Sequence, residues 1–211
     1  MSTSNLIRWS GLALMLGGAL TAIPMLFHPN ELADPSSMLS PAWAPIHTAI
    51  IFGLVLSLFG LVGAYARQSE NTGLVGFGGF ALSFVGSALF VAVITIDAYV
   101  IPAIVANGAE ALLAPDGPLF NGPLGLVFLL SGVVFALGTL LLGFATARAG
   151  ALPRWAGVAL IVGGPLLGFS GTLPHIASVI AGLLVGISYI GLGYRLFAAP
   201  QDVAMKAHVA M

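Results

Sequence analysis

Residues 8–27 read R-W-S-G-L-A-L-M-L-G-G-A-L-T-A-I-P-M-L-F, and after Arg8 this stretch holds no charged side chain. A helix that crosses a membrane needs about 20 mainly apolar residues, because the hydrocarbon core is about 30 Å thick and each helical residue adds about 1.5 Å. The stretch satisfies that requirement. It therefore predicts a membrane-spanning helix near the start of the chain.

The composition of the whole chain has the same character. Of its 211 residues, 59% are hydrophobic and only 6% are charged, whereas a soluble domain carries about 25% charged residues. A water-soluble globular fold is thus excluded. The net charge of -1 provides no basic surface for nucleic acid. We expect membrane lipid as a partner, with other membrane subunits or a second copy of the chain as further candidates.

Six segments are long and apolar enough to span a membrane. They are residues 6–27, 45–66, 74–96, 122–146, 155–173 and 175–197. The fold class expected is therefore an all-α, polytopic bundle of six transmembrane helices in one domain, residues 1–197, followed by a short tail at 198–211. Gly163, Gly164 and Pro165 interrupt the fifth segment and predict a kink there.

Basic residues predict the orientation, since Lys and Arg near helix ends are retained on the cytoplasmic side. With six helices, all of them fall on one side: Arg8, Arg67, Arg148, Arg154, Arg195 and Lys206. We therefore expect a multipass protein of a bacterial inner membrane with both termini in the cytoplasm.

The chain also contains an internal repeat. Residues 154–166, R-W-A-G-V-A-L-I-V-G-G-P-L, are identical to residues 8–20 at eight of thirteen positions, and the third segment keeps the skeleton G-x-A-L-x-x-x-G from Gly79. Three helical hairpins in the same orientation would produce this pattern. For the third and fourth segments, a chance match between Gly- and Ala-rich helices explains it equally well.

The repeat places ionisable residues at equivalent outer helix ends. Counting from the first shared glycine, His28 lies 17 residues on, while Asp97 and His175 lie 18 on; His47 opens the second segment as His175 opens the sixth. Imidazole with carboxylate suits transition metals, so His28, His47, Asp97 and His175 are candidate metal ligands. His47 and His175 are also a candidate pair of haem ligands. Alternatively, these residues lie at the membrane surface and need no special partner.

One short motif suggests hydrolysis. Gly168-Phe169-Ser170-Gly171 resembles the G-x-S-G motif of rhomboid intramembrane proteases, which are also six-helix proteins with a serine and histidine pair. The resemblance implies Ser170 as nucleophile and His175 as its base. Asp97 is the one further candidate, as a partner that would orient this base.

The chain as a whole resembles a group of small, uncharacterised six-helix bacterial membrane proteins, through R-W-x-G-L-A-L in the first segment, H-P at its end and L-P-R-W-A before the fifth. That resemblance implies no activity. By elimination we expect an accessory protein or one that binds a lipophile or other small ligand. The alternatives are a metal or haem protein, a transporter of a small apolar solute, and an intramembrane hydrolase.

Overall fold

The computed structural model describes residues 3–114 and 116–198, which form helices and no strands, so the all-helical prediction is confirmed. The long helices are α1 (Thr3–Met25), α2 (Trp43–Tyr99), α4 (Pro123–Ala149), α5 (Arg154–Gly168) and α6 (His175–Phe197), and the short ones are η1 (Pro35–Leu39), α3 (Ile101–Ala106), η2 (Glu110–Leu113) and η3 (Ser170–Thr172). Beyond Ala198, the expected tail with Lys206 lies outside the described residues.

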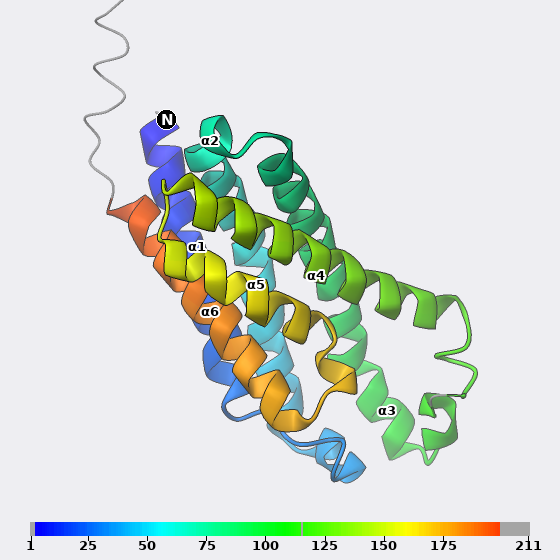
Figure 1. Ribbon diagram of the computed structural model, residues 1–211. Helices are drawn as coiled ribbons and strands as arrows, with labels where there is room; N and C mark the ends of the chain where they lie inside the picture. The colour runs from blue at the N-terminus through cyan, green and yellow to red at the C-terminus, as the bar shows by residue number, and fades with distance from the viewer. Residues whose placement is uncertain (1–2, 115, 199–211) are drawn as a thin grey trace, which may run out of the picture.

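The longest element, α2, is a helical hairpin. Gly73 interrupts it with φ 54° and ψ -152°, a conformation that essentially only glycine adopts. The indole Nε1 of Trp43 donates to the backbone O of Asp97 at 3.0 Å across 54 residues, although a straight helix would separate those residues by about 80 Å. Figure 1 shows the chain reversing there. Residues 43–72 and 74–99 are therefore antiparallel helical segments.

The helices pack as a closed ring of neighbours: α1 contacts α2 and α6, α4 contacts α2 and α5, and α5 contacts α6. Glycines make the closest approaches. A Cβ on Gly11 of α1 would lie 2.6 Å from Gly193 O of α6, and one on Gly157 of α5 would lie 2.6 Å from Gly143 O of α4. Small residues at such crossings let helix backbones touch. The connections after α1, α2 and α5 gather at one end of the bundle (Figure 1).

The interior of the bundle combines an apolar core with small hydroxyl side chains, and its outer faces carry large apolar side chains. Buried hydroxyl residues include Ser57, Ser83, Thr139 and Ser188, whereas large apolar side chains such as Phe59 are exposed on the outer faces. Four candidate spans are long and apolar enough to cross a membrane, namely α1, α2 continued into α3, α4 and α6; α5 is shorter, at 15 residues. Several long apolar helices are what a membrane protein requires.

Most helix boundaries differ from the sequence prediction by one to three residues, and two differ by five or six. The first part of α2 continues to residue 72 instead of ending at 66, because the polar turn is helical and Gln68 is buried, its Nε2 donating to Thr146 Oγ1 at 3.1 Å. The fifth helix ends at Gly168 instead of 173. Leu173 precedes Pro174 and is extended, with φ -100° and ψ 156°, as steric repulsion from a following proline favours.

Replacing Gly73 with alanine tests the hairpin. We expect Gly73→Ala to lower the free energy of unfolding by about 1–3 kcal/mol, because its φ is strained for any other residue. Gly78→Ala is the matched control: a Cβ meets nothing within 4 Å at either position, and only Gly73 has a positive φ. SDS-titrated unfolding in detergent micelles measures both. Equal stability of the two variants would contradict the assigned conformation.

Candidate functional site

The four residues that the sequence singled out as metal ligands lie at one end of the bundle, in one connected cluster. His47 Nε2 lies 3.2 Å from Asp97 Oδ2 and 3.2 Å from His28 Nε2. The rings of His28 and His175 have centroids 6.1 Å apart. Three of the chain's four histidines thus meet, although they come from three helix ends far apart in sequence.

The helix packing explains why these ends converge. Gly18 of α1 lies against the backbone O of Gly186 in α6, and a Cβ on Gly182 would meet Met25 Cγ at 2.5 Å. The end of α1, and His28 just beyond it, is therefore held beside the first turns of α6, which begin at His175. The reversal at Gly73 in turn returns Asp97 to the start of α2, where His47 lies.

Trp43 is the packing centre of the cluster. Its side chain is 2% exposed, and its ring centroid lies 4.3 Å from that of His47 and 5.4 Å from that of His28. Because Trp43 and His47 are four residues apart in a helix, their side chains share one face. The indole N–H also binds the Asp97 backbone. This one side chain therefore fixes two imidazoles and the neighbouring helix end.

The hydrogen bonds of the two central rings bring their Nε2 atoms together. The Nδ1 atoms of His28 and His47 lie 2.8 Å from the backbone oxygens of Pro29 and Trp43. Because carbonyl oxygens only accept hydrogen bonds, each Nδ1 acts as the donor. In a neutral ring, Nε2 then carries a lone pair and no hydrogen. Yet the two Nε2 atoms are 3.2 Å apart. A hydrogen shared between the two rings, or a cation beside them, would relieve the repulsion between these lone pairs.

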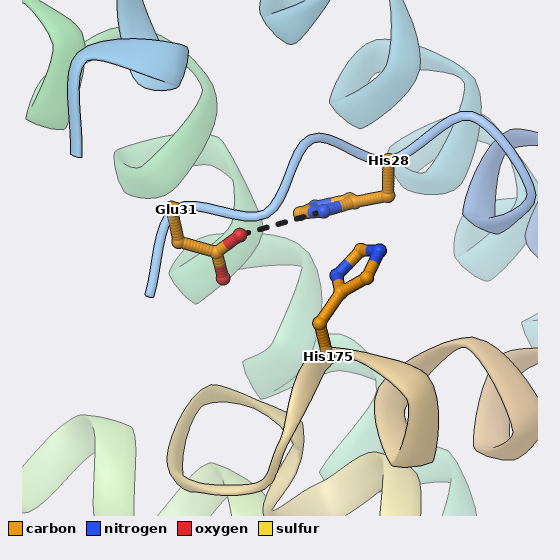
Figure 2. Close-up of side chains that lie close together, drawn as sticks. All are labelled: His28, Glu31 and His175. Carbon is orange, nitrogen blue, oxygen red and sulfur yellow. Dashed lines mark ion pairs between the residues drawn. The ribbon is translucent and has the colours of Figure 1, made fainter. Parts of the chain in front are cut away.

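Glu31 joins the cluster and was not among the predicted site residues. Its Oε2 lies 3.6 Å from His28 Nδ1, and one ligand atom each from His28, Glu31 and His175 lie within 4.8 Å of one another. Figure 2 shows the carboxylate directed at the His28 ring, with the His175 ring rising beside it from α6. The spacing H-x-x-E from His28 was the sequence signal, since residues three apart in a turn can bind one ion.

Burial shapes the protonation of His28, which lies in the loop beyond α1. Desolvation is the main cause that lowers its pKa below 6.5, and the nearby His47 lowers it further, while Glu31 and Asp97 act in the opposite direction. A lowered pKa favours the neutral imidazole, which is the form that binds metals. The surroundings of His28 therefore favour the neutral form, in which one ring nitrogen has a lone pair that can bind a cation.

A cavity of about 490 Å³ lies against the cluster, within the range of about 300–1,000 Å³ typical of small-molecule sites. Most of its wall is apolar and comes from several helices, including Ile50, Leu54, Phe90, Val93, Phe128 and Leu167. All five ionisable residues of the cluster also line it: His28, Glu31, His47, Asp97 and His175. The loop after α3 contributes Phe120. The cavity thus combines an apolar body with one polar region.

Two further roles predicted from the sequence can be compared with this geometry: haem binding by His47 and His175, and catalysis by Ser170. The His28 ring lies 4.9 Å from that of His47 and 6.1 Å from that of His175, so a haem held by His47 and His175 would require His28 to move. Ser170 lines the cavity; among the described residues its hydrogen bonds run through its backbone O, which accepts from Ser178 Oγ at 2.9 Å. No hydrogen bond in that part of the chain joins its hydroxyl to His175.

Comparison of the chain with known protein families, with curated proteins and with solved structures finds no match. The functional argument therefore rests on the cavity and its cluster.

Proposed function

We propose that this chain is a six-span protein of a bacterial inner membrane, with both termini cytoplasmic, that binds a small lipophile in the cavity. The six spans are α1, the two segments of α2, α4, α5 extended by η3, and α6. The cavity supports this proposal most directly, because its wall is mainly apolar and its ionisable residues gather in one region.

The exterior supports the membrane assignment. Large apolar side chains are exposed on the long helices, among them Phe52, Phe59, Leu126 and Ile187. In water such a surface would aggregate, whereas in lipid it is solvated. The reversal at Gly73 divides a 57-residue helix, about 85 Å long if straight, into two segments of about 45 and 39 Å, each long enough to cross a hydrocarbon core about 30 Å thick.

The contacts of equivalent glycines support the repeat for the first and fifth helices. Gly11 and Gly157 occupy the same position in the matched sequences. Gly11 of α1 packs on the carbonyl of Gly193 in α6, and Gly157 of α5 packs on the carbonyl of Gly143 in α4. In both cases the partner is the second helix of the preceding hairpin, if the third hairpin is counted as preceding the first. Equivalent residues thus make equivalent contacts, as related hairpins would.

The cavity supports a lipophile with one polar group. Apolar side chains favour an apolar body because burying it excludes water at about 25 cal/mol per Å². The buried His47 and the partly buried His28 and Asp97 would orient the polar group by hydrogen bonds, as a few placed polar residues do in ligand sites. An ion-coupled pump is less consistent with the sequence, which has no Asp, Glu, Lys, Arg or His near the middle of the proposed spans.

Filling the cavity tests the proposal. Val93 lines the cavity and is 7% exposed, so Val93→Trp should occupy ligand space. We expect mass spectrometry of organic extracts from the detergent-purified protein to find a lipophile with the wild type, and at least about tenfold less with Val93→Trp, equivalent to about 1.4 kcal/mol. Val93→Phe should give an intermediate loss.

Val85→Trp provides the matched control, because Val85 lies on the same half of α2 but is 50% exposed and outside the cavity. It should retain the wild-type amount of lipophile. Thermal unfolding of each variant separates ligand loss from misfolding. If the extracts of Val93→Trp and Val85→Trp contain the same lipophiles in the same amounts, lipid adheres only to the outer surface and the proposal fails.

A further inference from the structure

We infer that His28, Glu31 and His175 form a binding site for a divalent transition-metal ion at the wall of the cavity. The inference goes beyond the proposed function and does not depend on a lipophile being bound. It rests on the arrangement of these side chains, on a buried carboxylate oxygen without a hydrogen bond and on the polar groups that support them.

The ligand set has the composition and spacing of a metal site. One ligand atom from each residue lies within 4.8 Å of the other two, and two ligands of a tetrahedral zinc ion, each about 2.0–2.1 Å from the metal, lie about 3.3 Å apart. Small side-chain rotations would close that difference. Figure 2 shows all three side chains meeting from two directions, the α1 loop and the start of α6.

The carboxylate of Glu31 provides an independent observation. Its Oε2 is buried and has no hydrogen-bond partner among the described residues; its ion pair with His28 Nδ1 is long, at 3.6 Å. A buried carboxylate oxygen without a partner is unfavourable, because it has lost its hydration. A cation bound by Glu31 and the two histidines would supply the missing interaction.

The surrounding polar groups resemble the outer ligands of a metal site. His28 presents Nδ1 to Pro29 O and Nε2 to His47, so one of these contacts would give way to the ion while the other supports the ring. His47 in turn binds Trp43 O and faces Asp97. Such contacts orient a ligating imidazole and increase its basicity. His47 and Asp97, which the sequence suggested as ligands, are thus better placed as positioning residues for His28.

The donor set selects the class of metal. Two imidazoles and one carboxylate suit Zn²⁺ and Fe²⁺ and leave coordination positions open, whereas Mg²⁺ and Ca²⁺ prefer oxygen ligands throughout. Because the three residues line the cavity, the open positions would be available to a small molecule within it.

Zinc titration of the full chain tests this site. The detergent-purified protein is stripped with a chelator and titrated with Zn²⁺ by isothermal calorimetry, with bound metal counted by elemental mass spectrometry. We expect about one Zn²⁺ per chain and an affinity at least tenfold weaker in both Glu31→Gln and His175→Asn. Co²⁺ should give the visible absorption of a bound ion in the wild type and lose it in these variants. Excess Mg²⁺ should not displace Zn²⁺.

Glu110→Gln is the matched control, because it removes the same charge from an exposed glutamate in the loop that holds η2. Its zinc affinity should equal that of the wild type, and thermal unfolding should show that all variants fold. Equal zinc binding in the wild type, Glu31→Gln and His175→Asn would overturn the inference. So would a loss in His47→Asn that is larger than the loss in Glu31→Gln, because the metal would then lie elsewhere in the cluster.

Discussion

Replacing Trp43 with alanine is expected to reduce the free energy of unfolding by about 3–5 kcal/mol, the range for removing a large buried aromatic side chain. Trp43 is 2% exposed and contacts the rings of both His28 and His47. Its removal leaves a cavity and also deletes the hydrogen bond to Asp97 O. SDS-titrated unfolding in detergent micelles measures the loss.

Two further variants separate the causes. Trp43→Phe keeps an aromatic ring but lacks the N–H donor, so it should cost less, about 0.5–1.5 kcal/mol for the hydrogen bond together with some packing. Trp9→Ala removes the same side chain from a position that is 57% exposed, and should cost less than about 1 kcal/mol. If Trp9→Ala is as damaging as Trp43→Ala, the effect reflects interaction with detergent and not the packing of the cluster.

The sequence predicted the helices well because their signals are local. Apolar runs and the glycine pattern of residues 8–20 and 154–166 depend only on nearby residues. The helix ends were less predictable. Gln68 extends its helix into a polar stretch because it reaches Thr146, a partner 78 residues away that no local pattern reveals.

The cluster was predictable in part. The expected repeat would make several helix ends equivalent and so predicted that His28, His47, Asp97 and His175 share one end of the bundle. The structure brings these four side chains together there. Whether each of these residues is a proposed ligand or a positioning residue depends on differences in distance of an ångström or two, which cannot be obtained from a sequence. Glu31 has no equivalent position in the expected repeat of helix ends, because His28 and Glu31 follow the end of α1 in a loop.

Zinc is expected to raise the free energy of unfolding of the wild type by about 2.7 kcal/mol when its free concentration is 100 times its dissociation constant. The folded chain alone brings His28, Glu31 and His175 within 4.8 Å of one another, so the ion binds the folded state far better than the unfolded one. Unfolding of the chelator-treated protein, repeated across a series of Zn²⁺ concentrations, measures this dependence.

The effect of Glu31→Gln on the free energy of unfolding should depend on whether zinc is present. In metal-free buffer its stability should lie within about 1 kcal/mol of the wild type, because the ion pair with His28 is 3.6 Å long and the Glu31 side chain is 24% exposed. With Zn²⁺ present, the variant should gain much less stability than the wild type, whereas Glu110→Gln should gain as much. A carboxylate that matters only when the ion is present is acting as a ligand. If Glu31→Gln is already destabilised by several kcal/mol without metal, the carboxylate instead supports the loop after α1, and the stabilisation by zinc must arise from other residues.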